Sequence, residues 1–144
     1  MTETEEMTFH QRIRLPYRYA AGSAQRAALE GLATGVLRGS RCENCDVVLA
    51  PARPFCPRCS GATGAIVDLS DTGVLEGWTT RTRDGAAVTF AMIRLDGAGT
   101  TLMHRIEAAP DMLAVGLRVK ARWSGERQGE ITDIEVFEPE AREH

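Results

Sequence analysis

Long apolar runs are missing from this sequence of 144 residues. A membrane-spanning helix needs roughly 20 consecutive apolar residues, and no stretch of the chain approaches that length. Residues 1–7 are acidic, whereas a secretory signal begins with basic residues and continues with an apolar stretch. We therefore expect a cytoplasmic protein without a membrane segment.

Lysine is almost absent, because sixteen of the seventeen basic residues are arginine. Arginine presents a planar fork that suits carboxylate and phosphate groups, although a biased genomic base composition would enrich it equally well. The charges are also unevenly distributed. Eight arginines stand against three acids between Arg12 and Ser60, whereas fourteen acids stand against nine bases between Gly61 and His144. The first half of the chain is therefore its basic half.

Common catalytic motifs are missing as well. The chain has no G-x-S-x-G elbow, no Walker phosphate loop and no G-x-G-x-x-G dinucleotide fingerprint. Two of its three histidines, His10 and His144, lie near the chain ends, and a single strand histidine such as His104 is more often structural than catalytic. Carboxylates that alternate near the C-terminus indicate a solvated strand face: Glu126, Glu130, Asp133 and Glu135. We expect no enzymatic activity from the chain alone.

All the cysteines lie within eighteen residues, as two C-x-x-C knuckles separated by ten residues: Cys42, Cys45, Cys56 and Cys59. Each knuckle can supply two thiolates, and two knuckles complete the tetrahedron that zinc adopts in structural sites. No position would remain open for a catalytic water. The pattern predicts one structural zinc ion, and a ribbon this small should depend on that metal to fold.

Four cysteines also allow three alternatives to a zinc site. Two disulfides would suit a secreted chain, which the N-terminus does not indicate. A redox C-x-x-C motif normally stands alone at the start of a helix, whereas Pro and Arg surround the second knuckle. A four-thiolate site also suits iron, and the sequence alone does not separate iron from zinc.

Good helix formers dominate the stretch before the knuckles, so the sequence predicts a short helix over residues 24–33. Ser23 is a candidate N-cap and Gly35 a candidate helix end. The apolar stripe is narrow, so the helix must pack on something, with the ribbon and a partner subunit equally plausible. We also expect residues 1–16 to form a flexible tail and residues 17–36 a helical segment.

Short β-like runs follow the second knuckle, separated by Gly and Asp turn signals. We expect five strands, over residues 73–80, 88–95, 101–106, 118–123 and 131–137. The stretch from Ala108 to Gly116 reads as a short helix or turn between the third and fourth strands. Five strands with such an insertion predict an OB-type barrel. The fold class is thus mainly β, with a zinc ribbon at 37–64, a barrel at 65–138 and a C-terminal tail at 139–144.

Several stretches carry a resemblance to a known family: a short helix, then Leu37-Arg-Gly-Ser-Arg-Cys-Glu-Asn-Cys45, Ala50-Pro-Ala-Arg-Pro-Phe-Cys-Pro-Arg-Cys59, Gly73-Val-Leu-Glu-Gly77, Phe90-Ala-Met-Ile-Arg-Leu-Asp-Gly97 and Val115-Gly-Leu-Arg-Val119. Together they resemble the zinc-ribbon OB-fold family of acyl-CoA-associated proteins, from about Tyr17 to Pro139. The one departure is Asp46, where family members usually carry Gly. Asp tolerates turns well, so only the shape of that turn is in question.

The resemblance implies a rubredoxin-like ribbon and an accessory role in lipid metabolism. Relatives act with a thiolase-like or lipid-transfer-protein-like enzyme, in some cases beside an acyl-CoA hydratase, in carbon–carbon bond cleavage or formation. It also implies a coenzyme A thioester as a shared ligand. Charge asymmetry and resemblance together suggest four arginines for contact with coenzyme A phosphates or with the partner: Arg38, Arg41, Arg53 and Arg58. Carbon–carbon chemistry of this kind needs a free cysteine, so the nucleophile must belong to the partner.

The alternative is a single-stranded nucleic-acid-binding protein, since ribbons and OB barrels both occur in that class. Such proteins combine a basic groove with exposed aromatic side chains. Here the barrel half is acidic, and its aromatics lie among apolar neighbours and read as core: Trp78, Phe90, Trp123 and Phe137. The pI of about 5.6 also argues against this class.

Overall fold

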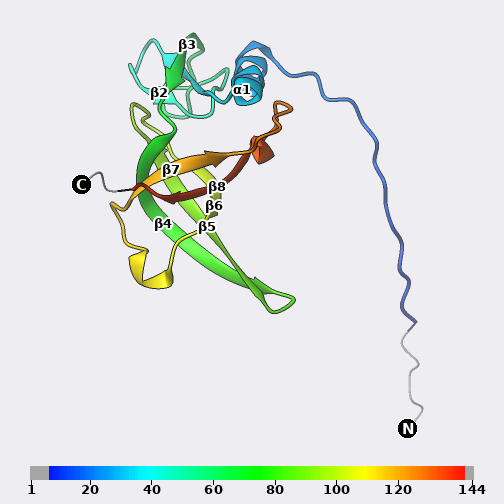
Figure 1. The fold of residues 1–144 in the computed structure, drawn as a ribbon. Coiled ribbons are helices and arrows are strands. Elements are labelled where there is room, and N and C mark those ends of the chain that lie inside the picture. Colours follow the sequence, from blue (N-terminus) through cyan, green and yellow to red (C-terminus); the bar gives the residue numbers. More distant parts are fainter. Residues whose placement is uncertain (1–6, 142–144) are drawn as a thin grey trace.

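The computed structural model describes residues 7–141, which form one helix, a small three-stranded sheet and a closed β-barrel (Figure 1). The predicted fold class, mainly β with a ribbon followed by a five-stranded OB-like barrel, is therefore confirmed. Part of each predicted tail, residues 1–6 and 142–144, lies outside the described residues. Within the described part, no helix is long and apolar enough to cross a bilayer.

Helix α1 (Ser23–Thr34) extends the predicted helix by one residue at each end. Its N-cap is Gly22, not Ser23, and no side chain caps it. At the other end Gly35 adopts φ 76°, and the N–H groups of Gly35 and Val36 donate to the carbonyls of Leu32 and Gly31. This pairing satisfies the last carbonyls and turns the chain directly into the first strand.

The ribbon is a sheet of order β2-β1-β3, built from β1 (Leu37–Cys42), β2 (Val48–Leu49) and β3 (Thr63–Leu69). Both neighbours of β1 run antiparallel to it. The register between β1 and β3 slips between Ser40 and Cys42, where the first knuckle begins. Sequence patterns did not predict these short strands individually, because the knuckle turns and not apolar alternation determine them.

Five strands close the barrel in the order β4-β5-β6-β8-β7. Their bounds are β4 (Thr72–Arg83), β5 (Ala86–Leu95), β6 (Leu102–Ile106), β7 (Arg118–Trp123) and β8 (Ile134–Pro139). The insertion between β6 and β7 contains only the 3-10 turn η1 (Pro110–Met112). Pairing of β4 with β7 completes the closure, so these strands all have two neighbours.

Helix, ribbon and barrel share buried contacts. Leu32 of α1 and Leu37 of β1 belong to the same apolar cluster as Leu75 and Phe137 of the barrel. A second small cluster joins Ala24 and Ala28 of the helix to Ala52 of the ribbon. The helix therefore packs on the ribbon and barrel of its own chain, and the ribbon was one of the two surfaces that the sequence left open.

Two predictions about the barrel were wrong. The segment expected to begin the last strand is a 3-10 turn, η2 (Ile131–Asp133), because the Asp133 side chain turns back onto backbone N–H groups and stops the pairing. The four aromatics are not all core residues. Phe137 is fully buried, Phe90 and Trp123 are half-buried, and Trp78 on β4 is 42% exposed.

Candidate metal centre

The two knuckles bring their four sulfur atoms together. The Sγ atoms of Cys42, Cys45, Cys56 and Cys59 all lie within 4.8 Å of one another, which confirms the predicted cluster. The first residue of each knuckle is buried and the second is exposed, so the centre lies at the ribbon surface with one side turned inward. Cys42 Sγ and Cys59 Sγ, from different knuckles, are 3.5 Å apart.

Backbone geometry is the same in both knuckles. The N–H of Asp46 donates to Cys42 O, and the N–H of Ser60 donates to Cys56 O, each over 2.8 Å. Asp46 and Ser60 have φ 53° and 60°, the left-handed conformation that favours glycine. Glycine takes this conformation without a steric penalty, and the hydrogen bond from the Asp46 N–H shows that Asp46 keeps the turn.

Hydrogen bonds also act on the sulfur atoms. Gly61 N–H donates to Cys59 Sγ over 3.4 Å and, as the largest effect, lowers the pKa of the Cys59 thiol to about 7. Backbone N–H groups of Cys59 and Arg58 lower the pKa of the Cys56 thiol. In the protein without metal, hydrogen bonding to Cys59 raises the pKa of the Cys45 thiol to about 12. Donors of this kind orient sulfur ligands and favour thiolates.

The donor set fits a tetrahedral zinc ion. Bonds of about 2.3 Å to zinc place tetrahedral sulfur atoms about 3.8 Å apart, and the observed spacing brackets that value. A disulfide would need its two sulfur atoms about 2.05 Å apart, so none of these pairs is one. Four thiolates complete the coordination and leave no position for a reacting water. Iron in the same donor set has the same geometry.

The four arginines suggested by the sequence divide into two pairs. Arg38 contacts Asp68 over 3.1 Å, and Arg41 contacts Asp46 over 3.0 Å. Arg53 and Arg58 are exposed, and within residues 7–141 neither forms an ion pair. The structure therefore does not gather the four into one site, and only Arg53 and Arg58 keep their charges unpaired by a described carboxylate.

The remaining titratable candidates have structural surroundings. The ring nitrogens of His104 lie 3.3 Å from the carbonyl oxygens of Arg105 and Ile131, and the ring meets Phe137 edge-on at 5.6 Å. Asp133 was expected on a solvated face, and this was wrong. The residue is 4% exposed, and its carboxylate accepts hydrogen bonds from the N–H groups of Gln128, Gly129 and Glu130.

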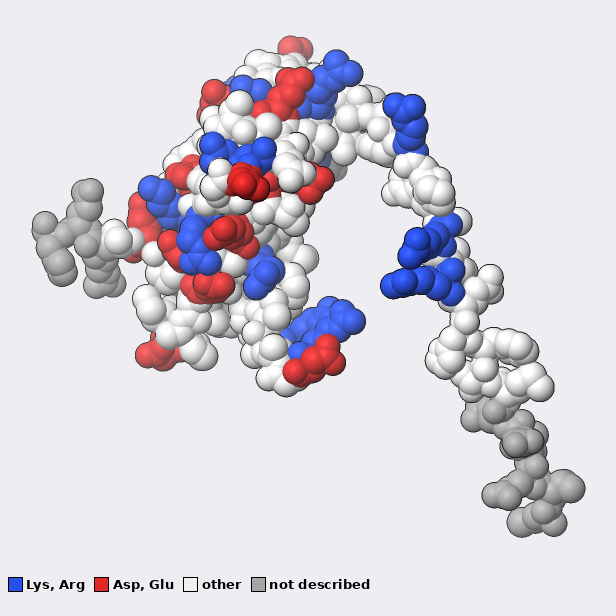
Figure 2. Space-filling view, turned by 45° about the vertical axis from the view of Figure 1, so that its right-hand side comes forward, with Lys and Arg blue, Asp and Glu red and all other residues white. Residues whose placement is uncertain are grey.

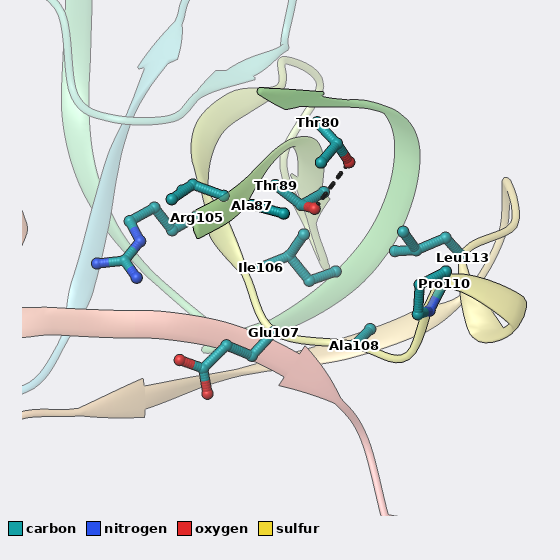
Figure 3. Close-up of a pocket in the computed structure, with 10 residues that line it drawn as sticks. Thr80, Ala87, Thr89, Arg105, Ile106, Glu107, Ala108, Pro110 and Leu113 are labelled. Atoms are coloured by element: carbon teal, nitrogen blue, oxygen red, sulfur yellow. Dashed lines mark hydrogen bonds between the residues drawn. The ribbon is translucent and has the colours of Figure 1, made fainter. Parts of the chain in front are cut away.

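A pocket of about 390 Å³ lies beneath the β4–β5 hairpin (Figure 3). Thr80 of β4 and Thr89 of β5 lie side by side in its lining, joined by a 2.9 Å hydrogen bond, with Ile106 and Leu113 below them in the view of Figure 3. The charged ends of Arg105 and Glu107 extend away from Leu113, and Glu107 is held by Arg122 over 3.0 Å. The pocket thus offers hydroxyl and aliphatic groups, without an acid and base facing each other.

Solved structures of the same fold include the following two. One is a DUF35-family protein of unknown function from Sulfolobus solfataricus, 22% identical, with a TM-score of 0.58 over 69% of this chain and 78% of that chain. The other is described as an Ltp2-ChsH2(DUF35) aldolase, 22% identical, with a TM-score of 0.60 over 85% of this chain and 98% of that chain. No curated protein sequence gave a significant match.

Two family models match consecutive parts of the sequence. Residues 29–64 match the ChsH2 rubredoxin-like zinc ribbon domain, which contains both knuckles. Residues 66–124 match the ChsH2 C-terminal OB-fold domain, which contains most of the barrel. Because these matches together span more than half of its residues and agree with the fold, the chain belongs to the ChsH2 family of zinc-ribbon OB-fold proteins.

Proposed function

We propose that this protein is a non-catalytic accessory subunit that binds one structural zinc ion and assembles with a thiolase-like enzyme acting on acyl-CoA substrates. The observation that carries the proposal is the commitment of every cysteine of the chain to the metal centre. A thiolase-type reaction needs an activated cysteine, so the nucleophile must come from a partner. The family membership and the description of a neighbour as an Ltp2-ChsH2(DUF35) aldolase support the same role.

The metal's role would be architectural. Cys42 and Cys56 hold it from the buried side, and Leu49 packs in the same small cluster. Zinc supplies the bonds that a ribbon with so little apolar core lacks, and thereby fixes the loops between the knuckles. No reaction step is assigned to the ion, because four protein ligands fill its coordination shell.

Arg53 and Arg58 are the arginines that we propose for contact with coenzyme A phosphates or with the partner. Both project from the second knuckle region and are exposed, whereas Arg38 and Arg41 are paired with carboxylates of the ribbon. An exposed guanidinium can donate two parallel hydrogen bonds to a phosphate. Arg26 on α1 is an exposed arginine outside the ribbon and serves as the matched control.

The test is recovery of the tagged full-length chain from its own host at low salt, followed by native mass spectrometry and metal analysis. One zinc ion together with a thiolase-like subunit is the expected result. Arg53→Ala with Arg58→Ala should then weaken binding of the complex to a coenzyme A thioester, and Arg26→Ala should not. Bound oligonucleotide without such a subunit would replace this function by the nucleic-acid-binding alternative.

A further inference from the structure

The N-terminal arm, defined as residues 9–19, is an amphipathic segment without a neighbour in the described structure. No helix or strand forms between residues 7 and 22, and every residue from 7 to 20 is exposed. Figure 1 shows the segment leading away from α1, and Figure 2 shows its basic side chains standing apart from the body of the molecule. The arm is nevertheless anchored at one end, because α1 packs on the ribbon and barrel.

Apolar and basic side chains alternate along the arm with a period of two. Apart from Gln11, the odd positions carry large apolar residues, each 70–83% exposed: Phe9, Ile13, Leu15, Tyr17 and Tyr19. The even positions carry His10, Arg12, Arg14 and Arg18, together with Pro16. Successive side chains of an extended strand point to opposite faces, so an extended arm has one apolar face and one basic face.

The pattern fits an extended conformation and not a helix. On a helix, residues 9, 13, 15, 17 and 19 would spread over roughly 200° of the circumference, with Arg12 and Pro16 among them, whereas an extended backbone places all five on one face. Pro16 also disfavours helical backbone at Leu15, because its ring clashes with the preceding residue in that conformation. Five large apolar side chains on one face of a solvated segment are typical of a surface that is covered by a partner.

The charges of the arm indicate which kind of surface would bind it. No acid occurs between residues 7 and 29, so the basic face calls for carboxylates along the rim of an apolar groove. A second copy of this chain offers such carboxylates only at scattered positions. Six barrel acids are paired internally with Arg94, Arg118 and Arg122, namely Glu76, Asp96, Glu107, Glu135, Glu138 and Glu140. The exposed acids outside ion pairs in the described part lie on α1, after β1, in η1 and between β7 and η2: Glu30, Glu43, Asp111, Glu126 and Glu130.

We propose that the arm docks in extended form into an apolar groove lined by carboxylates on the thiolase-like subunit. The proposal rests on the proposed function and adds the segment that makes the contact. It also assigns the interface to the arm instead of α1, whose apolar residues Ala24, Ala28 and Leu32 are already buried within the chain. An anchored arm of this kind can wrap a partner while the ribbon and barrel stay unchanged.

The test measures affinity between the full-length chain and the thiolase-like subunit recovered with it, after separate purification, by isothermal titration calorimetry. One variant removes the apolar face with Ile13→Ser, Leu15→Ser and Tyr17→Ser. A second exchanges neighbours, with Ile13→Arg, Arg14→Ile, Tyr17→Arg and Arg18→Tyr, which keeps composition and net charge but breaks the alternation. Both should weaken binding at least tenfold while zinc content and thermal unfolding stay as in the wild type.

Wild-type affinity in both variants would overturn the arm proposal and leave the proposed function standing. The arm proposal would also be wrong if only a charge reversal, Arg12→Glu with Arg14→Glu and Arg18→Glu, weakened binding, because the apolar face would then be unused. A wild-type dimer that the serine variant abolishes, with partner affinity unchanged, would assign the arm to a second copy. Failure of the wild-type chain itself to bind the subunit would overturn the proposed function, and the arm's role with it.

Discussion

Asp46 and Ser60 occupy equivalent positions in the two knuckles, each directly after the second cysteine and each in the left-handed conformation, at φ 53° and 60°. Each donates its N–H to the carbonyl of the first cysteine of its knuckle over 2.8 Å. The metal centre is thus built from one turn used twice. Both turns carry a side chain that a left-handed backbone disfavours. Replacing either residue by glycine should therefore stabilise the folded protein.

Ser60→Gly should stabilise the zinc-bound protein by about 1 kcal/mol, because glycine adopts the left-handed conformation without the Cβ clash. Asp46→Gly should gain less, since it also removes the exposed ion pair with Arg41. Guanidinium unfolding with zinc in excess measures both changes. Ser60→Ala is the control, and a gain from alanine equal to that from glycine would contradict the backbone explanation.

Two glycines of β4 should respond in opposite ways to alanine. A Cβ at Gly73 would meet the backbone of Arg94 and Leu95 on the neighbouring strand β5, whereas nothing lies within 4 Å of a Cβ at Gly77. Gly73→Ala should therefore destabilise the protein by about 1–3 kcal/mol. Gly77→Ala should be neutral or stabilising by a few tenths to about 1 kcal/mol, because it restricts the unfolded chain. If the two substitutions changed the free energy of unfolding equally, the close approach of strand β5 to Gly73 would not exclude a Cβ there.

Acid should weaken the ion pair between Asp96, which follows β5, and Arg118 of β7. Arg118 donates two hydrogen bonds to Asp96, 2.7 and 2.6 Å long, and lowers the pKa of that carboxyl from 3.8 to about 2. Because the folded pKa is below the unfolded one, this contribution to stability is complete above the unfolded pKa and is lost as pH falls through the folded pKa. Asp96→Asn removes it.

The difference in thermal unfolding temperature between wild type and Asp96→Asn should thus shrink from about pH 5 to about pH 2. Protonation of the thiolates releases metal in the same range, but it affects both proteins equally and cancels in the difference. Asp111→Asn is a matched control, because Asp111 is exposed and forms no ion pair within the described residues. A difference that does not vary with pH would contradict the role given to Asp96.

Metal removal should destabilise helix α1 as well as the ribbon. Leu37 of β1 and Leu32 of α1 share the barrel's apolar cluster, so loss of the zinc tetrahedron withdraws support from α1. We expect chelation, or Cys59→Ser, to raise amide hydrogen exchange throughout residues 23–49 while β5 and β7 stay protected. Exchange that rises in the knuckles alone would show that the ribbon and helix are energetically separate.

Elements with a strong local pattern could be predicted from the sequence. Strand β7 was placed residue for residue, and α1 to within one residue at each end, because alternation and helix formers fix such segments. The clustering of the four cysteines could equally be predicted from their spacing alone. The hydrogen bonds of the Asp133 side chain could not be predicted from the sequence. The spacing of Glu130 and Asp133 resembled a strand edge, and only the folded chain shows that Asp133 turns inward to bind three N–H groups.

The sequence likewise could not predict which arginines form ion pairs. Arg38, Arg41, Arg53 and Arg58 form one basic stretch along the chain, but only the register of β1 with β3 places Asp68 beside Arg38. Alternation in the arm, by contrast, is present in the sequence itself. It gained meaning only when the structure showed the apolar residues of the arm exposed and the apolar stripe of α1 already buried.

Zinc binding and assembly with a thiolase-like enzyme are the two parts of the function that we propose. Native mass spectrometry of the tagged chain from its own host, with metal analysis of the same sample, tests both parts at once. We predict a complex that contains one zinc ion per copy of this chain together with a thiolase-like subunit. A chain recovered without zinc, or with zinc but only with oligonucleotide, would contradict the proposal.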